Sequence, residues 1–106
     1  MAATEVQIPV YNITAPGVVV VPPTRSKFVG YIMSGGSAGN LTFNDCATLA
    51  AASSANQILS LPYNVAAIAT IGVSNALNWP LLAGLVVSSV PTGATLAVIY
   101  TQFVGA

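Results

Sequence analysis

The sequence predicts an antiparallel β-sandwich of the jelly-roll or immunoglobulin-like kind, and three observations lead to this prediction. Apolar and polar residues alternate with a period of two along several short stretches. These stretches are rich in Val, Ile, Thr and aromatic residues, which favour strands. Turn residues such as Pro22-Pro23, Gly35-Gly36 and Pro80 interrupt the chain at intervals typical of short antiparallel strands. The length of 106 residues indicates a single domain.

The N-terminal segment is expected to be extended. Val6, Ile8 and Val10 alternate with other residues, and a later run of four valines ends at a Pro-Pro pair. This texture suits the first strands of a sandwich, and it equally suits an arm that reaches onto a neighbouring subunit. The chain is therefore divided into residues 1–26, an arm or the first strands, and a β-sandwich domain over residues 27–106.

Two strands are predicted over residues 27–34 and 41–45, with a Gly-rich stretch between them that we interpret as a hairpin turn. In the first strand, alternation puts Phe28 and Ile32 on one face and Tyr31 on the other. A Gly-rich stretch can also bind phosphate where it opens a helix, but here strand residues flank it on both sides, which favours the turn.

The remaining segments are less uniform. Residues 45–56 are rich in Ala, which favours helix, and Asp45 could cap a helix start. The same small residues suit a loop, and we expect a loop or one short turn there. Branched side chains favour a strand over residues 64–73, and renewed alternation over residues 94–103 predicts the last strand.

Charged side chains are unusually scarce in this chain. They make up 4% of the residues, against about 25% in an ordinary soluble domain, and none occurs after Asp45. A chain with zero net charge tends to associate. Because burying an unpaired charge costs several kcal/mol, charge depletion suits a subunit whose surface is covered by its neighbours.

Two classes of partner are excluded by the same composition. A membrane-spanning helix needs about 20 consecutive apolar residues. The best candidates, residues 65–73 and 81–90, are too short, and no signal peptide precedes them. Nucleic-acid binding needs a basic surface, and Arg25 and Lys27 do not make one. We expect neither a membrane nor a nucleic acid as partner.

Enzymatic chemistry is also not expected. The chain has no histidine, and Glu5, Lys27 and Asp45 are its main candidates for proton transfer. Asp45 follows a predicted strand, so a turn or cap role is favoured for it. Cys46 is the single cysteine and is expected to be a small buried side chain. We predict no catalytic residue, no metal ligand and no cofactor.

Aromatic and β-branched side chains are the candidates for contact with neighbours. Trp79 has two interpretations: a plug at one end of the core, which is favoured, or an interface anchor. The tyrosines divide in the same way between the edge of the core and a contact surface. The candidate interface residues are Val6, Ile8, Val10, Tyr11, Val18, Val20, Tyr63 and Trp79.

Three stretches of the chain resemble small virion proteins of tailed bacteriophages. "FVGYIMSGGSAGNLTFNDC" carries a G-Y-I strand, a Gly/Ser turn and a strand that ends in Asp. "NQILSLPYN" follows it. "NWPLLAGLVVSSVPTGATLAVIYTQF" carries a P-x-x-x-G-L-x-V strand, which in this pattern pairs through a P-T-G-A turn with a last A-x-V-x-Y strand. The resemblance is one of texture and order, covers residues 27–103 and does not extend to the N-terminal segment.

The resemblance implies a β-sandwich subunit on a phage particle, namely a capsid decoration or cement protein that binds and stabilises the head shell. Its partners would be the major capsid protein or other virion proteins, and it would form a homo-oligomer, with a trimer favoured. It would be made in the host cytoplasm and located in the virion, on the capsid surface. The alternatives are a tail, collar or fibre component, and a surface module that binds a receptor or a carbohydrate.

Overall fold

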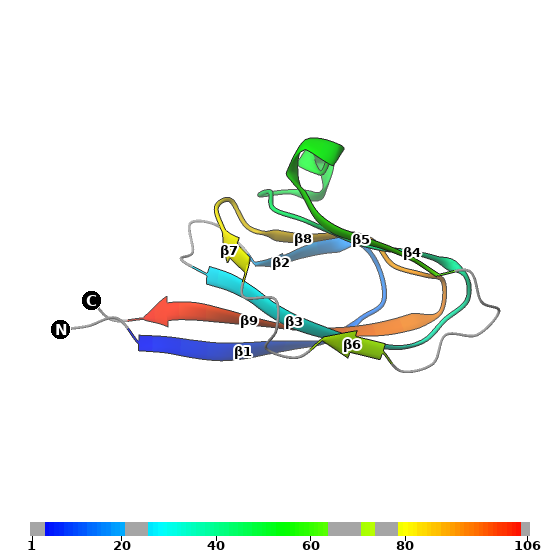
Figure 1. The fold of residues 1–106 in the computed structure, drawn as a ribbon, viewed down its shortest axis with the longest axis horizontal. Coiled ribbons are helices and arrows are strands. Elements are labelled where there is room, and N and C mark those ends of the chain that lie inside the picture. The colour runs from blue at the N-terminus through cyan, green and yellow to red at the C-terminus, as the bar shows by residue number, and fades with distance from the viewer. Residues whose placement is uncertain (1–3, 21–25, 64–70, 74–78, 105–106) are drawn as a thin grey trace.

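Two antiparallel sheets, packed face to face, form the molecule in this computed structural model (Figure 1). The structure describes residues 4–20, 26–63, 71–73 and 79–104. The first sheet has the order β1-β9-β3-β6, with β7 also paired to β3, and the second has the order β2-β8-β4-β5. The strands are β1 (Thr4–Ile13), β2 (Gly17–Val20), β3 (Ser26–Gly35), β4 (Gly39–Asn44), β5 (Gln57–Tyr63), β6 (Ile71–Val73), β7 (Trp79–Leu81), β8 (Leu85–Ser89) and β9 (Ala94–Val104). The predicted all-β sandwich is confirmed.

The strand pairing is nested, which identifies the connectivity as a jelly roll. β1 pairs with β9, β2 with β8, β3 with β6 and β7, and β4 with β5. The two halves of the chain thus form one long antiparallel ribbon, and rolling this ribbon brings β9 beside β3 and β8 beside β4. Residues 4–13 and 17–20 are strands of the two sheets, so this part of the N-terminal segment belongs to the sandwich.

The Gly-rich stretch after β3 crosses between the sheets, so the predicted hairpin is wrong. β3 lies in the first sheet and β4 in the second, and each pairs elsewhere. Gly36 has a φ of +88°, and a Cβ placed on it would lie 2.8 Å from the Cβ of Ala94. Only glycine suits this close approach, which is secured by the Ser37 N–H donating to the Thr92 carbonyl at 2.9 Å.

The pairing of the last two strands, which the resemblance implied, is wrong for the same reason. The turn after β8 leads into β9, but β8 belongs to the second sheet and β9 to the first. In a rolled ribbon, strands that follow one another along the chain separate into opposite sheets, and their partners come from distant sequence. Local turn chemistry therefore predicts that the chain turns, but not which strand it pairs with next.

A single core fills the space between the sheets. Phe43 lies at its centre, with its ring centroid 4.7 Å from that of Phe28 and 5.5 Å from that of Tyr31. Apolar burial of this kind contributes about 25 cal/mol per Å² to stability. The other large side chains that are fully buried in this cluster are Met33, Leu41, Leu85, Val87, Leu96 and Val98.

A β-bulge in β3 changes which of its side chains face the core. Phe28 lies opposite Tyr100 and Tyr31 opposite Val98, with an extra residue between them. Because of this insertion Phe28 and Tyr31 share the buried face, whereas Ile32 is 44% exposed. The prediction that Phe28 and Ile32 lie on one face is therefore wrong, since simple alternation does not include the extra residue.

The Ala-rich segment after β4 forms two single 3₁₀ turns, η1 (Leu49–Ala51) and η2 (Ser54–Asn56). This agrees with the expected loop or short turn, although there are two turns rather than one. In Figure 1 they lie above the second sheet, on its outer side. Within the described ranges, no helix has the length and apolarity needed to cross a membrane. Of residues 64–73, for which a strand was predicted, 71–73 form β6 and the others lie outside the described residues.

Candidate functional site

The outer face of the first sheet is aliphatic near its centre, whereas Gln7, Lys27 and Thr101 lie beside one another on the same face toward one end. Core-facing residues alternate along β9 with Ala97 and Ile99, which therefore point outward. Residues directly opposite each other in antiparallel strands share a face, so Pro9 lies beside Ile99 and Ile32 beside Ala97. We call these four residues the aliphatic face. It crosses three neighbouring strands and offers a partner no side-chain hydrogen-bonding group of its own.

The outer face of the second sheet carries hydroxyl and amide groups on β4, β5 and β8, and Val18, which is 43% exposed, lies on the same face on the edge strand β2. The Thr42 and Ser60 hydroxyls lie 3.1 Å apart across β4 and β5 and share a hydrogen bond. The Ser89 hydroxyl donates to the Asn40 carbonyl at 2.8 Å, and the Ser88 hydroxyl donates to the Asn44 Oδ1 at 2.6 Å. We call this region the hydroxyl face. Its polar groups bond to one another within one subunit, and the exposed ones can also bond to water.

Asn44 ties the two 3₁₀ turns to the hydroxyl face. Its side chain is almost fully buried, and its amide donates to the Ser53 carbonyl and to the Asn56 Oδ1, both at 2.8 Å. Asn56 in turn accepts from the Ser53 N–H and donates to the Ala51 carbonyl, and Ser53 and Asn56 form a capping box. These bonds satisfy the groups that the short turns leave unpaired, so the segment is held in place.

Asp45 holds the loop between β7 and β8. Its Oδ1 accepts from the backbone N–H groups of Leu82, Ala83 and Gly84, the shortest at 2.8 Å to Ala83, and its Oδ2 accepts from Leu82 at 3.0 Å. Hydrogen bonds to a carboxylate are about twice as strong as neutral ones. Asp45 thus stabilises a turn, but one that is distant in sequence. The cap role that was the other expectation is wrong, because Thr48 and Ser53 cap the two 3₁₀ turns that follow Asp45.

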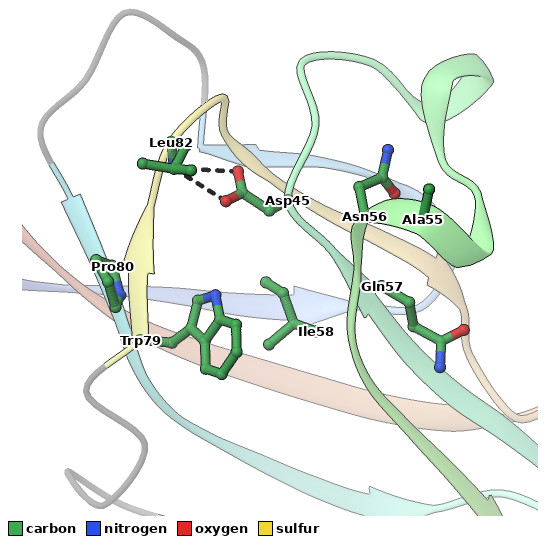
Figure 2. A pocket seen from close by; sticks show the side chains of 8 residues that line it. All are labelled: Asp45, Ala55, Asn56, Gln57, Ile58, Trp79, Pro80 and Leu82. Atoms are coloured by element: carbon green, nitrogen blue, oxygen red, sulfur yellow. Dashed lines mark hydrogen bonds between the residues drawn. The ribbon is translucent and has the colours of Figure 1, made fainter.

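A groove of about 490 Å³ opens along one edge of the sandwich. One wall is β7 with the residue that follows it, and the other is η2 with the start of β5, so the groove lies between the two sheets (Figure 2). Trp79 is 47% exposed, and its indole faces the Ile58 side chain. Trp79 is thus half accessible on a groove wall, and the favoured prediction of a core plug is wrong. The groove is lined by Asp45, Ala55, Asn56, Gln57, Ile58, Trp79, Pro80 and Leu82.

Cys46 lies directly after the groove residue Asp45 and is 4% exposed. Burial raises the pKa of its thiol, and the neighbouring Asp45 carboxylate acts in the same direction. The thiol donates to the Thr48 carbonyl at 3.3 Å, and hydrogen bonding with the Thr48 backbone lowers the pKa without cancelling the effect of burial. The thiol is therefore protonated at neutral pH, which suits the predicted small buried side chain and not a nucleophile.

The candidate interface residues do not form one patch. Val6, Ile8 and Val10 share the core-facing side of β1, with Ile8 and Val10 partly buried. Tyr11 is 68% and Val18 43% exposed, on strands of different sheets. Trp79 lies in the groove, and the side chains of Val20 and Tyr63 lie outside the described residues.

Sequence reasoning missed the aliphatic face. The available signal is the alternation along residues 94–103, which puts Ala97 and Ile99 on the same side of that strand. Comparison with protein-family models, with curated proteins and with solved structures finds no match to this chain. What the molecule offers to a partner is therefore inferred from its surfaces: an aliphatic sheet face, a hydroxyl sheet face and an aromatic groove between the sheets.

Proposed function

We propose that the protein is a non-enzymatic structural component of a bacteriophage virion, and specifically a capsid decoration or cement protein. The observation that carries this proposal is the difference between the two outer faces. The centre of the first outer face is aliphatic with Ile32 exposed, whereas β4, β5 and β8 of the second sheet carry hydroxyl and amide groups that bond within the subunit. A jelly roll with an exposed aliphatic patch is suited to attachment to a shell. Jelly-roll domains are also known from viral capsid proteins.

The proposed mechanism is adhesive. The molecule measures 51 Å by 26 Å along its two longer axes, which gives a sheet face enough area for the roughly 800 Å² per partner that stable interfaces bury. Burying the aliphatic face would supply the driving force, at about 25 cal/mol per Å² of apolar surface. Because ion pairs contribute little, attachment should depend weakly on salt.

The proposed partners are the major capsid protein or other virion proteins, together with copies of this chain. Closed symmetry lets a subunit cover an apolar surface without forming an open polymer, and a trimer is the favoured closed assembly. The proposed location is the capsid surface, after synthesis in the host cytoplasm.

Quantitative mass spectrometry of purified particles of the phage that carries this gene tests the proposal. We expect hundreds of copies per particle, and cryo-electron microscopy should show the first sheet turned toward the shell. Six or twelve copies would instead assign the protein to the tail, collar or fibre, which is the alternative within the same class. Absence from the purified particle would overturn both assignments.

A further inference from the structure

We infer that the groove between β7 and the start of β5 binds a neutral saccharide. This inference goes beyond the proposed structural role, since a decoration protein can attach to a shell without binding any sugar. The groove lies at an open edge of the sandwich, and its two walls come from different sheets. Its volume of about 490 Å³ falls in the range of 300 to 1,000 Å³ that is typical of small-molecule sites.

The aromatic wall supplies the surface on which a sugar ring can stack. Trp79 is 47% exposed and faces Ile58 across the groove (Figure 2). One side of a pyranose ring presents C–H groups, which pack on an aromatic or aliphatic surface, while its hydroxyls point outward. An indole combines a large apolar face with an N–H donor at its edge, so it can contact both parts of such a ligand.

The hydrogen-bonding groups of the groove favour an uncharged ligand that donates hydrogen bonds over a charged ligand. Among the described residues that line it, Asp45 is the only charged one. Its Oδ1 accepts from three backbone N–H groups, but its Oδ2 accepts from one, so Oδ2 keeps room for a ligand hydroxyl. The three N–H dipoles already offset the carboxylate charge, which weakens the attraction for a cation. An anionic ligand would find no basic side chain among the described lining residues.

The groove is also rigidly built, which lowers the entropic cost of binding. Asn56 uses its amide in bonds to Ser53, Ala51 and Asn44, so the η2 wall is fixed by hydrogen bonds within the chain. The other wall is fixed by β7, which pairs with β3, and by the loop held by Asp45. A ligand therefore meets a formed site rather than a loop that must first become ordered.

Trp79 is the only tryptophan of the chain, so intrinsic fluorescence reports directly on the groove. The isolated protein is titrated with glucose, galactose, mannose, N-acetylglucosamine, lactose, maltose and cellobiose, and with glucuronic acid and glucosamine as charged counterparts. We expect a saturable change in emission with at least one neutral sugar and a weaker response to its charged counterpart. A synthetic uncharged peptide in extended conformation serves as the competing class of ligand.

Calorimetry on variants then assigns the contact. Trp79→Ala should weaken sugar binding at least tenfold. The control Tyr11→Ala removes an exposed aromatic side chain outside the groove and should leave binding unchanged. Thermal melting verifies that both variants fold. The inference is overturned if no sugar gives a saturable signal, if binding survives in Trp79→Ala, or if only the charged sugars or the peptide bind. These results do not depend on the virion assay, so either proposal can fail alone.

Discussion

The two outer faces of this sandwich belong to the same small jelly roll and yet differ in chemistry near their centres. The first sheet exposes Ile32 and presents Ile99 beside Pro9. The second sheet presents hydroxyls that bond to one another, such as those of Thr42 and Ser60, and two 3₁₀ turns lie over part of it. The comparison teaches that removing nearly all charge from a protein does not make its surface uniform.

The difference has a simple physical basis. Water can bond to an exposed hydroxyl, so the hydroxyl face can remain wet at little cost. Water cannot bond to an aliphatic side chain, so covering the aliphatic face releases free energy in proportion to its area. Charge depletion thus allows either face to be buried, but the side-chain chemistry favours burial of the first sheet.

The largest expected effect is a charge placed on the aliphatic face. Ile32→Asp should weaken self-association or attachment at least a hundredfold, because a carboxylate buried without a partner costs several kcal/mol and each 1.4 kcal/mol is about tenfold in affinity. Sedimentation velocity over a range of concentrations measures the self-association. Ser60→Asp on the hydroxyl face is the matched control and should change association less than about threefold. Equal effects of the two variants would contradict the proposed orientation.

The second prediction concerns folding stability, for which we expect the second sheet to be the more sensitive one. Asn44→Ala should lower the free energy of unfolding by about 2–4 kcal/mol, because it leaves the Ser53 carbonyl and the Ser88 hydroxyl without their buried partner. Urea denaturation measures the change. Ile32→Asp should alter the stability of the monomer by less than about 1 kcal/mol, since Ile32 is 44% exposed. A stable Asn44→Ala variant would show that water replaces the network.

The third prediction concerns the groove, which joins the two faces. Asp45→Ala removes four hydrogen bonds to the loop between β7 and β8, and we expect a loss of about 2–3 kcal/mol. Asp45→Asn retains one carbonyl oxygen and should lose about half as much. Thermal melts of the two variants rank them. If Asp45→Asn costs as much as Asp45→Ala, the retained carbonyl oxygen contributes nothing and the whole effect comes from the carboxylate.

The smallest expected effects come from replacing a threonine by valine, which should change the free energy of unfolding in opposite directions on the two sheets. Thr101 is 2% exposed, and no described residue accepts or donates a hydrogen bond to its hydroxyl. Thr101→Val should therefore raise the free energy of unfolding by about 1 kcal/mol, because it removes a buried unsatisfied group without changing the size of the side chain. Thr42→Val loses the bond to Ser60 and should lower it by about 0.5 kcal/mol. Destabilisation by Thr101→Val would indicate that its hydroxyl has a partner.

Sequence reasoning predicted individual strands well because alternation is a local property. The last strand was predicted over residues 94–103, and the structure has β9 over Ala94–Val104, with Leu96 and Val98 fully buried on one face. It failed at Phe28 and Ile32, because a bulge depends on how β3 pairs with β9 and leaves no mark in the alternation itself. A role for Asp45 in a turn was predicted, but the loop that its carboxylate binds was not, because that loop lies far along the chain.

Composition and two-residue alternation were enough to predict an all-β sandwich with few charged side chains, because both act over a few neighbouring residues. The jelly-roll pairing, the difference between the two outer faces and the groove beside Trp79 were not predictable in this way. Each of these depends on contacts between residues that are distant in sequence, and such contacts form only when the whole ribbon is rolled.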